Sequence, residues 1–387
     1  MQNFQFSERL QQLPPYLFVE IDKAKRQARA EGRDIIDVGI GDPDLPAPEF
    51  IIEALHKAAC DGNNHHYALD AGMLSLRQAI AKWYKRRFNV ELNPDNEILP
   101  LIGSKEGIAH LPLGVINPGD KVLVPDPCYP PYRSGTIFAG GKIELMPLLA
   151  KNGFLPDLNK IGGKKPFKLL FFNSPDNPTS AVAGREFLRQ LVDFARERNI
   201  IVASDAAYSE IYFDGQKPAS ILEIEGAKEV AVEFHSLSKT YNMAGWRIGW
   251  VCGNSQIVSA IAKVKTNIDS GIFQAIQIAG ITALESDDSH PEEMRRIYQE
   301  RRDVLINGLR NIGWKIEGPK ATFYVWAKIP KKFKDSIETA RAFLEQANIV
   351  VTPGVGFGKY GEGFVRFALT VPKERLVEAA ERLKKVL

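Results

Sequence analysis

A lysine and an arginine lie close together in a polar turn that follows an apolar run. The segment Glu233–Trp250 (EFHSLSKTYNMAGWRIGW) carries two hydroxyls, an amine and a guanidinium, on Ser236, Ser238, Lys239 and Arg247. Such groups at the end of a strand could bind a phosphate and place a nucleophilic amine beside it. A bare Ser-x-Ser-Lys turn is more often a surface loop. The glycine-flanked stretch Ala244–Gly249 nevertheless favours a close backbone approach, and with it a functional interpretation.

A carboxylate ends a second apolar run. In Asn199–Tyr212 (NIIVASDAAYSEIY) the run stops at Asp205, and Tyr208 follows three residues later. A carboxylate at a buried strand end is costly unless a cation is paired with it. Taken alone, the segment is better explained by Asp205 as the N-cap of the next helix.

Two further segments place polar groups next to apolar runs. Leu101–His110 (LIGSKEGIAH) reads as a strand, a glycine and a helix start, where backbone N–H groups near Ser104 and Lys105 form a natural anion site. An ordinary turn capped by Ser104 explains that segment equally well. In Gly358–Thr370, Arg366 lies inside an apolar strand, and a buried arginine requires a carboxylate partner.

The elements that must position these residues alternate along the chain. Apolar residues at helical spacing predict helices at Pro48–Ala59 and Leu74–Phe88. Short apolar runs bounded by turn residues predict buried strands at Ile98–Ile102, Lys121–Val124, Lys168–Phe172, Ile200–Ala203 and Val230–Phe234. This rhythm is typical of an α/β fold with a mostly parallel sheet between helices. In such sheets ligands bind at the carboxyl ends of the strands, directly after these runs.

The rhythm changes after a long charged helix, which is expected from about Pro291 to Leu309. The pattern beyond it predicts a smaller α+β domain, with elements at Phe323–Ala327, Ser336–Ala347, Ile349–Val351, Phe364–Leu369 and a closing helix. The helix Tyr16–Ala30 is expected to pack against that domain, because no strand of the main sheet is evident before Ile35. The expected division is an N-terminal segment at 1–45, a large domain at 46–285 and a small domain at 286–387.

Composition sets the broad class of protein. The 387 residues are 44% hydrophobic and 25% charged, which excludes a disordered or low-complexity protein. The net charge of +3 gives no argument for nucleic acid or an anionic membrane, and no apolar run approaches the length of a membrane helix. The first residues lack a signal-peptide pattern, so a cytoplasmic enzyme is expected. Cys60, Cys128 and Cys252 lack disulfide or zinc spacing, and no metal site is predicted.

The segment SLSKTYNMAGWRIG (236–249) resembles the lysine segment of class I and II aminotransferases, which are fold-type I enzymes dependent on pyridoxal phosphate. The resemblance covers essentially the whole chain and implies a seven-stranded, mostly parallel sheet in the large, cofactor-binding domain. It also implies that Lys239 is the Schiff-base lysine and later the proton shuttle. It assigns the cofactor phosphate to Ser104, Lys105, Ser236, Ser238 and Arg247.

Other family motifs imply the remaining cofactor contacts. Asp205 would hold the protonated pyridine nitrogen, which keeps the ring an electron sink. Tyr208 and Asn177 would hydrogen-bond the phenolic oxygen, and Tyr129 would stack on the ring. Asn177 comes from the turn FFNSPDNPTSA, in which Ser180 stands where the family commonly has glycine. Serine tolerates a positive φ poorly, so the geometry of that turn is in question.

The same resemblance implies a homodimer with composite active sites, because Tyr67 matches a tyrosine that reaches the phosphate of the neighbouring subunit. Arg366 would bind the substrate α-carboxylate, and Gly41 would donate its backbone N–H to the same group. Within the family, LPPYLFVEI (13–21), GIGDPDLP and KTNIDSGIFQAIQ resemble the enzymes that act on LL-diaminopimelate. Tyr16 would then line the substrate pocket, and Asp70 could meet the distal ammonium. A solvated loop aspartate explains Asp70 equally well.

The expected reaction is LL-diaminopimelate and 2-oxoglutarate to tetrahydrodipicolinate and glutamate, in lysine biosynthesis. A general aspartate, alanine or aromatic aminotransferase, or a β-lyase on the same scaffold, remains open, because pocket side chains decide between them. The sensor part of a pyridoxal-dependent transcription regulator is disfavoured, since the chain has no room for a DNA-binding domain before Tyr16. A non-catalytic cofactor-binding module conflicts with the presence of both Lys239 and Arg366.

Overall fold

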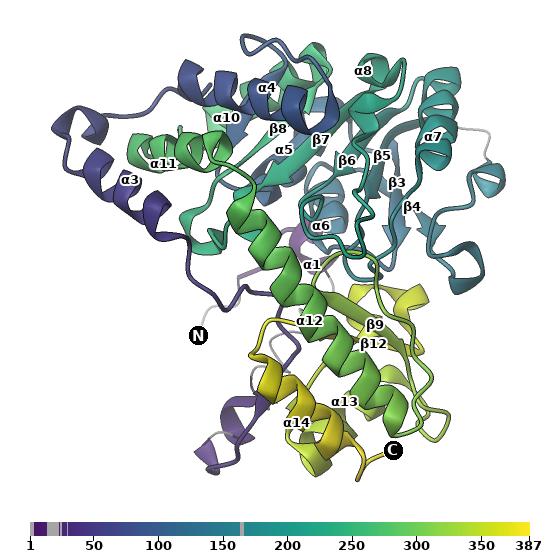
Figure 1. Ribbon diagram of the computed structural model, residues 1–387. Coiled ribbons are helices and arrows are strands. Elements are labelled where there is room, and N and C mark those ends of the chain that lie inside the picture. The colour runs from purple at the N-terminus through teal and green to yellow at the C-terminus, as the bar shows by residue number, and fades with distance from the viewer. Residues whose placement is uncertain (1–3, 14–22, 24, 29, 163–165) are drawn as a thin grey trace.

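A seven-stranded sheet forms the centre of the computed structural model, which describes residues 4–13, 23, 25–28, 30–162 and 166–387 (Figure 1). Its strand order is β2-β8-β7-β6-β5-β3-β4, and β8 alone runs antiparallel to its neighbours. The strands are β2 (Ile98–Leu101), β3 (Lys121–Asp126), β4 (Lys142–Pro147), β5 (Phe167–Asn173), β6 (Ile201–Asp205), β7 (Ala231–Ser236) and β8 (Gly249–Gly253).

Side chains of this large sheet alternate between two apolar layers, as the pleat of a strand requires. Along β5, Leu169 and Phe171 join one layer, whereas Leu170 and Phe172 join the other. The first layer includes residues of α5 (Ser104–Val115), α6 (Pro131–Phe138) and α10 (Ser255–Ile268). The second includes residues of α3 (Glu49–Ala59), α4 (Leu74–Phe88), α7 (Arg185–Arg198) and α11 (Gln274–Glu285). Helices therefore cover both faces of the sheet.

A smaller sheet lies beside the large one, joined to it by the long helix α12 (Ser289–Asn311) (Figure 1). Its antiparallel strand order is β11-β12-β9, and β1 pairs separately, in parallel, with β10. These strands are β1 (Ile36–Asp37), β9 (Tyr324–Lys328), β10 (Ile349–Val350), β11 (Thr352–Pro353) and β12 (Phe364–Ala368). A third apolar cluster joins them to α12, α13 (Ser336–Ala347) and α14 (Lys373–Leu383).

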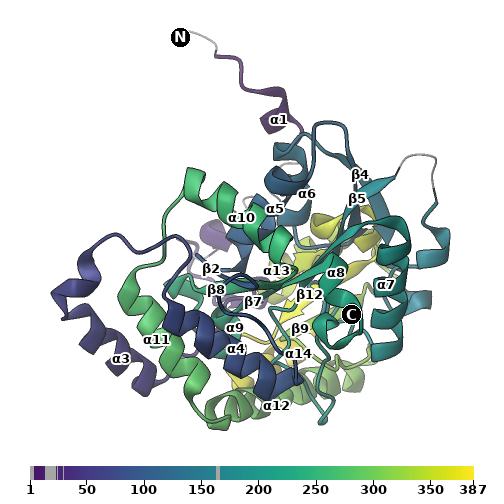
Figure 2. The same cartoon turned by 90° about the horizontal axis from the view of Figure 1, so that it is seen from above.

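Short helices complete the described chain: α1 (Glu8–Gln11), α8 (Ala227–Val230) and α9 (Leu237–Thr240). In Figure 2, α1 lies next to α6 at the rim of the molecule, where the Arg9 guanidinium donates to the Phe138 carbonyl at 3.0 Å. Within the described part of the chain, none of the helices combines the length and apolar character that a bilayer crossing requires.

The expected α/β fold with a mostly parallel seven-stranded sheet is confirmed. The predicted helix at 74–88 is α4, and the predicted helix at 336–347 is α13. The sequence patterns do not single out β4 and β8. The helix expected over 16–30 lies largely outside the described residues, and the domain limits near 45 and 285 stay predictions.

Candidate active site

A cavity of about 220 Å³ opens at the carboxyl edge of the large sheet. The turns that follow β2, β5, β6 and β7 all contribute to its wall, as expected for parallel strands whose carboxyl ends share one edge. Ten of the predicted side chains line the cavity: Ser104, Lys105, Tyr129, Asn177, Asp205, Tyr208, Ser236, Ser238, Lys239 and Arg247. Residues far apart in the sequence are thus brought together in one place.

Lys239, one of the two lysines that line this cavity, is positioned by a single helical turn. Lys239 lies in α9, directly after β7, and its Nζ donates to the Gly41 carbonyl at 3.3 Å. Burial lowers the pKa of Lys239 from 10.5 to about 8; the charge of Asp42 opposes that change, and the charges of Arg247 and Arg366 add to it. A neutral amine is therefore accessible near neutral pH, as a nucleophile requires.

Beside the lysine, hydroxyl and guanidinium groups form a cradle for an anion. Gly103 is the N-cap of α5 at a φ of 73°, and a Cβ there would overlap the Arg247 guanidinium. The Ser236 Oγ accepts from the Ser238 N–H at 3.2 Å. The Ser238 Oγ is buried and has no hydrogen-bond partner within the described residues. An unsatisfied buried hydroxyl beside an arginine and the start of a helix fits a phosphate group.

Asp205, which also lines the cavity, ends β6 and is buried. Its Oδ2 accepts from the Tyr132 hydroxyl at 2.7 Å, and its Oδ1 accepts from the Ala207 N–H at 3.2 Å. Burial raises the pKa of Asp205, although both hydrogen bonds act against that change. Neither donor carries a charge, so within the described residues this carboxylate has no hydrogen-bonded cation of the kind a protonated pyridine nitrogen would supply.

Two tyrosines and an asparagine close the cavity toward the small sheet. The Tyr208 and Tyr324 hydroxyls are 2.9 Å apart, and burial holds the pKa of Tyr208 well above its usual value. Asn177 Oδ1 accepts from the Arg366 guanidinium at 2.8 Å. That guanidinium also donates to the Gly39 carbonyl at 2.8 Å and lies over the Tyr324 ring, 4.0 Å from its centroid. Arg366 is therefore fixed at the rim of the cavity.

Gly41 and Ser180 explain two local features of the fold. A Cβ on Gly41 would overlap the Tyr324 hydroxyl, so only glycine allows this tyrosine to reach the cavity. Ser180 adopts the left-handed conformation, at a φ of 62°, that its substitution for glycine put in question. Its Oγ pairs with the Thr322 hydroxyl at 2.7 Å and donates to the Tyr324 carbonyl at 2.9 Å, which holds the turn.

Of the predicted site residues, Tyr67 and Asp70 lie away from this cavity, and Tyr16 lies outside the residues that the structure describes. Tyr67 is 94% exposed and follows the short turn Gly62–His65, and the half-buried Asp70 lies in the same loop. Neither lines the cavity. Tyr16 lies outside the described residues. The roles proposed for these three residues remain predictions.

Sequence reasoning missed Tyr132, Asn173 and Tyr324. The segment PDPCYPPY contains two tyrosines, and only the first, Tyr129, was singled out. Asn173 ends β5, and its amide donates to the Asp205 carbonyl at 2.7 Å. Tyr324 begins the strand β9, whose first four residues, YVWA, read as core. Nothing in one sequence distinguishes its hydroxyl from that of an ordinary buried tyrosine.

Comparisons with known proteins agree with this geometry. A family model described as aminotransferase class I and II matches residues 33–383. An LL-diaminopimelate aminotransferase from Moorella thermoacetica is 52% identical over 385 residues, which are 99% of this chain and 98% of that relative. Substrate-bound BacF from Bacillus subtilis is 40% identical, with a TM-score of 0.95 over 99% of this chain and 98% of its own. A double mutant of Thermus thermophilus aspartate aminotransferase is 30% identical, with a TM-score of 0.93 and both chains fully covered. With a lysine, an anion cradle and a buried aspartate around one cavity, the chain belongs to the class I and II aminotransferases, enzymes of fold type I.

Proposed function

We propose that this aminotransferase uses pyridoxal phosphate to convert LL-diaminopimelate and 2-oxoglutarate reversibly into tetrahydrodipicolinate and glutamate. The substrate assignment rests on the 52% identity, over nearly the full length of both chains, to a relative named for LL-diaminopimelate. The cofactor assignment rests on Lys239, the anion cradle and Asp205 lining one cavity.

The donor groups of the cavity match the parts of pyridoxal phosphate. The phosphate would be held by hydroxyls, a guanidinium and the first turn of α5, from Ser104, Lys105, Ser236, Ser238 and Arg247. Asp205 would pair with the ring nitrogen, Tyr129 would stack on the ring, and Tyr208 and Asn177 would bind the phenolic oxygen. When bound, the cofactor supplies an aldehyde that bonds amines and a ring that withdraws electrons.

The residues of the chain have separate tasks in this reaction. Lys239 Nζ would hold the cofactor aldehyde and, once the substrate amine has replaced it, take the proton from the substrate α-carbon. Its lowered pKa suits a group that must be neutral to accept that proton. Arg366 would bind the α-carboxylate through two parallel hydrogen bonds. Its contacts with Asn177 and Gly39 fix the guanidinium in advance, and Gly41 would add a backbone N–H.

We further propose a homodimer whose active sites are composite. The side chain of Tyr67 is almost fully exposed, and Leu69 in the same loop is 77% exposed. Aromatic and apolar side chains in such positions fit a surface that a second copy of the chain covers. In that arrangement Tyr67 would reach the partner's cofactor phosphate, and Asp70 and Tyr16 would bind the substrate.

Replacement of the lysine tests the cofactor assignment. Lys239→Ala should remove the near-visible absorbance of the protein-bound imine and abolish turnover together, because Lys239 is the amine proposed to bond the aldehyde, whereas Lys105 is assigned to the phosphate. Borohydride reduction followed by peptide mass analysis should label residue 239 in the wild-type enzyme. Labelling at another lysine, or no absorbance with pyridoxal phosphate supplied, would refute the assignment.

A titration with amino donors tests the substrate. Bleaching of the same absorbance by LL-diaminopimelate and glutamate, and not by aspartate, alanine or phenylalanine, is the expected result. Bleaching by aspartate or phenylalanine at comparable concentration would instead identify a general aminotransferase with the same lysine and fold.

A further inference from the structure

A buried lysine outside the proposed reaction lies in α10. Lys265 is fully buried, whereas most lysines in proteins are exposed. Its ammonium has three donors. It meets Asp269 Oδ1 at 2.6 Å, Glu106 Oε1 at 3.0 Å and the Ser270 carbonyl at 3.0 Å. Every donor of this buried charge therefore has an acceptor.

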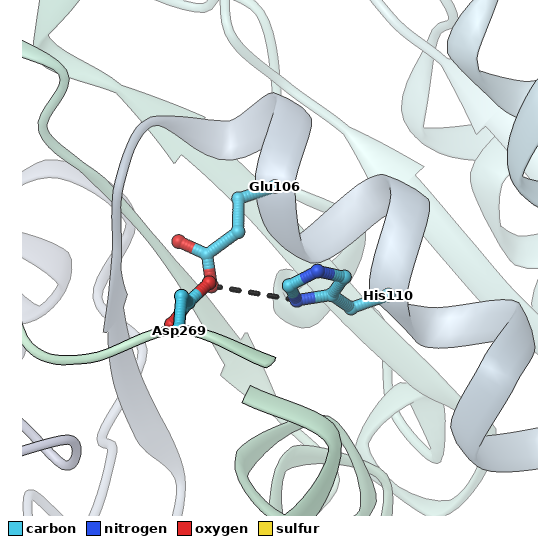
Figure 3. A group of neighbouring side chains, drawn as sticks. All are labelled: Glu106, His110 and Asp269. Atoms are coloured by element: carbon cyan, nitrogen blue, oxygen red, sulfur yellow. Dashed lines mark ion pairs between the residues drawn. The ribbon is translucent and has the colours of Figure 1, made fainter. Parts of the chain in front are cut away.

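The carboxylates around it resemble a metal-binding group only if the lysine is ignored. Figure 3 shows Glu106 and His110 on one helix and Asp269 facing them, and their ligand atoms lie within 4.8 Å of one another. The Lys265 ammonium already forms ion pairs with both carboxylates. Burial tends to raise the pKa of Glu106, but the contacts with His110, Lys265 and the Ile102 N–H outweigh it, so the pKa is lowered. Glu106 is accordingly an ionised member of an ion network.

The second oxygen of Glu106 fixes the turn that enters α5. Glu106 Oε2 accepts from the Ile102 N–H at 2.5 Å. The N-cap of α5 is Gly103, which has no side chain to cap the helix. Glu106, the third residue of the helix, reaches back across this cap in the manner of the returning half of a capping box. The turn so held contains Ser104 and Lys105, which line the cavity.

The other side of the lysine holds the loop after α10. Lys265 binds Asp269 and the Ser270 carbonyl there. The next residue, Gly271, is in close contact with the backbone of Leu69, and a Cβ on Gly271 would overlap the Leu69 carbonyl. One ammonium group thus joins the turn before α5 to a loop that packs on the 67–70 segment.

We propose that Lys265 is a positioning residue for the cofactor phosphate, because it neutralises Glu106 and so keeps the Ile102–Lys105 turn in its phosphate-binding conformation. This inference rests on the proposed function. Without the ammonium, Glu106 becomes a buried carboxylate that must take up a proton or rotate toward water. Either change weakens its bond to the Ile102 N–H. A displacement of the turn by about 1 Å is enough to impair groups that must meet a phosphate at hydrogen-bond distance.

The test compares two ligands that differ only in the phosphate. Dissociation constants of pyridoxal phosphate and of pyridoxal are measured with cofactor-stripped full-length protein by absorbance titration. Lys265→Met should reduce the preference for pyridoxal phosphate at least tenfold and leave the constant for pyridoxal within twofold of wild type. A merely structural role would lower the melting temperature and affect both ligands alike.

Two further variants separate the charge from the hydrogen bond. Glu106→Met removes the acceptor for the Ile102 N–H and should lose the preference as Lys265→Met does. The double variant Lys265→Met/Glu106→Gln has no orphaned carboxylate at position 106, and its amide oxygen can still accept, so the preference should return to within threefold of wild type. If Lys265→Met does not fold, Glu106→Met and the double variant together still test whether Glu106 positions the turn. The control is Lys85→Met, which breaks the exposed pair of Lys85 on α4 with Glu91, in the loop after that helix, at the same 3.0 Å length, and it should change neither constant.

The outcomes are distinct from those for the proposed function. If wild-type protein binds both ligands equally, the cofactor proposal fails and this inference fails with it. If wild type prefers pyridoxal phosphate and Lys265→Met and Glu106→Met keep that preference, the inference alone is overturned.

Discussion

At the scale of single residues, Asp205 is a buried carboxylate whose side-chain partners in the described chain are neutral donors. The Tyr132 hydroxyl lies 2.7 Å from Oδ2, and the Tyr132 ring stacks on Phe171 with centroids 5.0 Å apart. Stacking fixes the direction in which the hydroxyl points. Tyr132 is thus placed to hold Asp205 in the orientation that a ring nitrogen would meet, and it acts through that aspartate.

Tyr132→Phe should therefore lower kcat about tenfold, because a hydrogen bond to a charged group contributes roughly 1.5 kcal/mol or more. Tyr84→Phe is the matched control, since the buried Tyr84 hydroxyl donates to the Glu233 carboxylate at 2.9 Å away from the cavity. Both variants should lose similar stability in thermal unfolding, and only Tyr132→Phe should lose kcat. Equal kcat values in the two variants would contradict the role of Tyr132.

At the same scale, the burial of Lys239 lowers the free energy of unfolding. Its pKa is lowered on folding from 10.5 to about 8, so the folded state binds its proton less tightly than the unfolded state. Above pH 10.5 the lysine is neutral in both states, so its burial does not lower the free energy of unfolding. As the pH falls from 10.5 to 8, the unfolded state takes up a proton that the folded state does not, and the free energy of unfolding falls. Below pH 8 the full cost is present. The difference of 10.5 − 8 = 2.5 pKa units corresponds to about 3 kcal/mol.

Lys239→Met should accordingly stabilise the cofactor-free protein at pH 7 by up to about 3 kcal/mol. The gain should shrink as the pH rises from 8 toward 10.5, because the wild-type lysine is then neutral in both states. Denaturant unfolding at pH 7 and pH 10 measures this. A gain that does not change with pH would show that packing, and not desolvation of the charge, is responsible.

At the scale of elements, the start of α5 combines a backbone conformation that favours glycine with a close contact. Gly103 has a φ of 73° and leaves room for the Arg247 guanidinium. Gly103→Ala should therefore carry both a conformational cost of about 1 kcal/mol and a displacement of Arg247, and the pyridoxal phosphate dissociation constant should rise at least tenfold. Gly119→Ala is the control, because Gly119 has a φ of 89° but open space around it. Gly119→Ala should lower stability and leave cofactor affinity unchanged. An equal loss of cofactor affinity in both variants would refute the role of the contact between Gly103 and Arg247.

The elements also show what a single sequence reveals. β6 (IVASD) begins as an apolar run, and its burial follows from that pattern. β7 (AVEFHS) is buried throughout although it carries Glu233 and His235. β4, with KIELMP at the edge of the sheet, has few buried residues and gives no such run. β8, with GWVCG, is fully buried, but its two glycines read as turn signals.

The same limit applies to the site. Lys239, Asp205 and Arg247 stand next to strand ends in recognisable motifs, so sequence reasoning predicts them. Tyr324 lies within a strand and reaches the cavity only because Gly41, far away in the sequence, has no side chain. A contact between such distant residues leaves no local pattern for sequence reasoning to detect.

At the scale of the whole molecule, the cavity depends on both sheets. Asp205 ends a strand of the large sheet and Lys239 follows another, whereas Tyr324 comes from the small sheet, where Arg366 of β12 lies over its ring. The segment before α3 is bonded to the small sheet along its backbone: the Ala368 N–H donates to the Val38 carbonyl at 2.7 Å. The proposed carboxylate site, from Gly41 and Arg366, is thus attached to the small sheet, whereas the proposed cofactor site is built on the large one.

Arg301 of α12 joins the two chain segments that form this carboxylate site. Its guanidinium binds both carboxylate oxygens of Asp44 at 2.7 and 2.8 Å and donates to the Leu369 carbonyl at 3.0 Å. Asp44 lies three residues after Gly41, and Leu369 lies three residues after Arg366. Arg301→Met should therefore raise KM for the amino acid and the oxo acid together, about tenfold, since both present an α-carboxylate to the same groups.

The cofactor dissociation constant should stay within twofold of wild type in that variant, because the proposed phosphate and ring contacts belong to the large sheet. Lys373→Met is the control: it breaks the exposed pair of Lys373 with Glu300, one residue before Arg301 on α12, and should change neither KM nor cofactor affinity. Steady-state kinetics with both substrates and a cofactor titration give the three constants. A fall in kcat at unchanged KM, or a parallel loss of cofactor affinity, would mean that Arg301 supports the fold as a whole and not the carboxylate site.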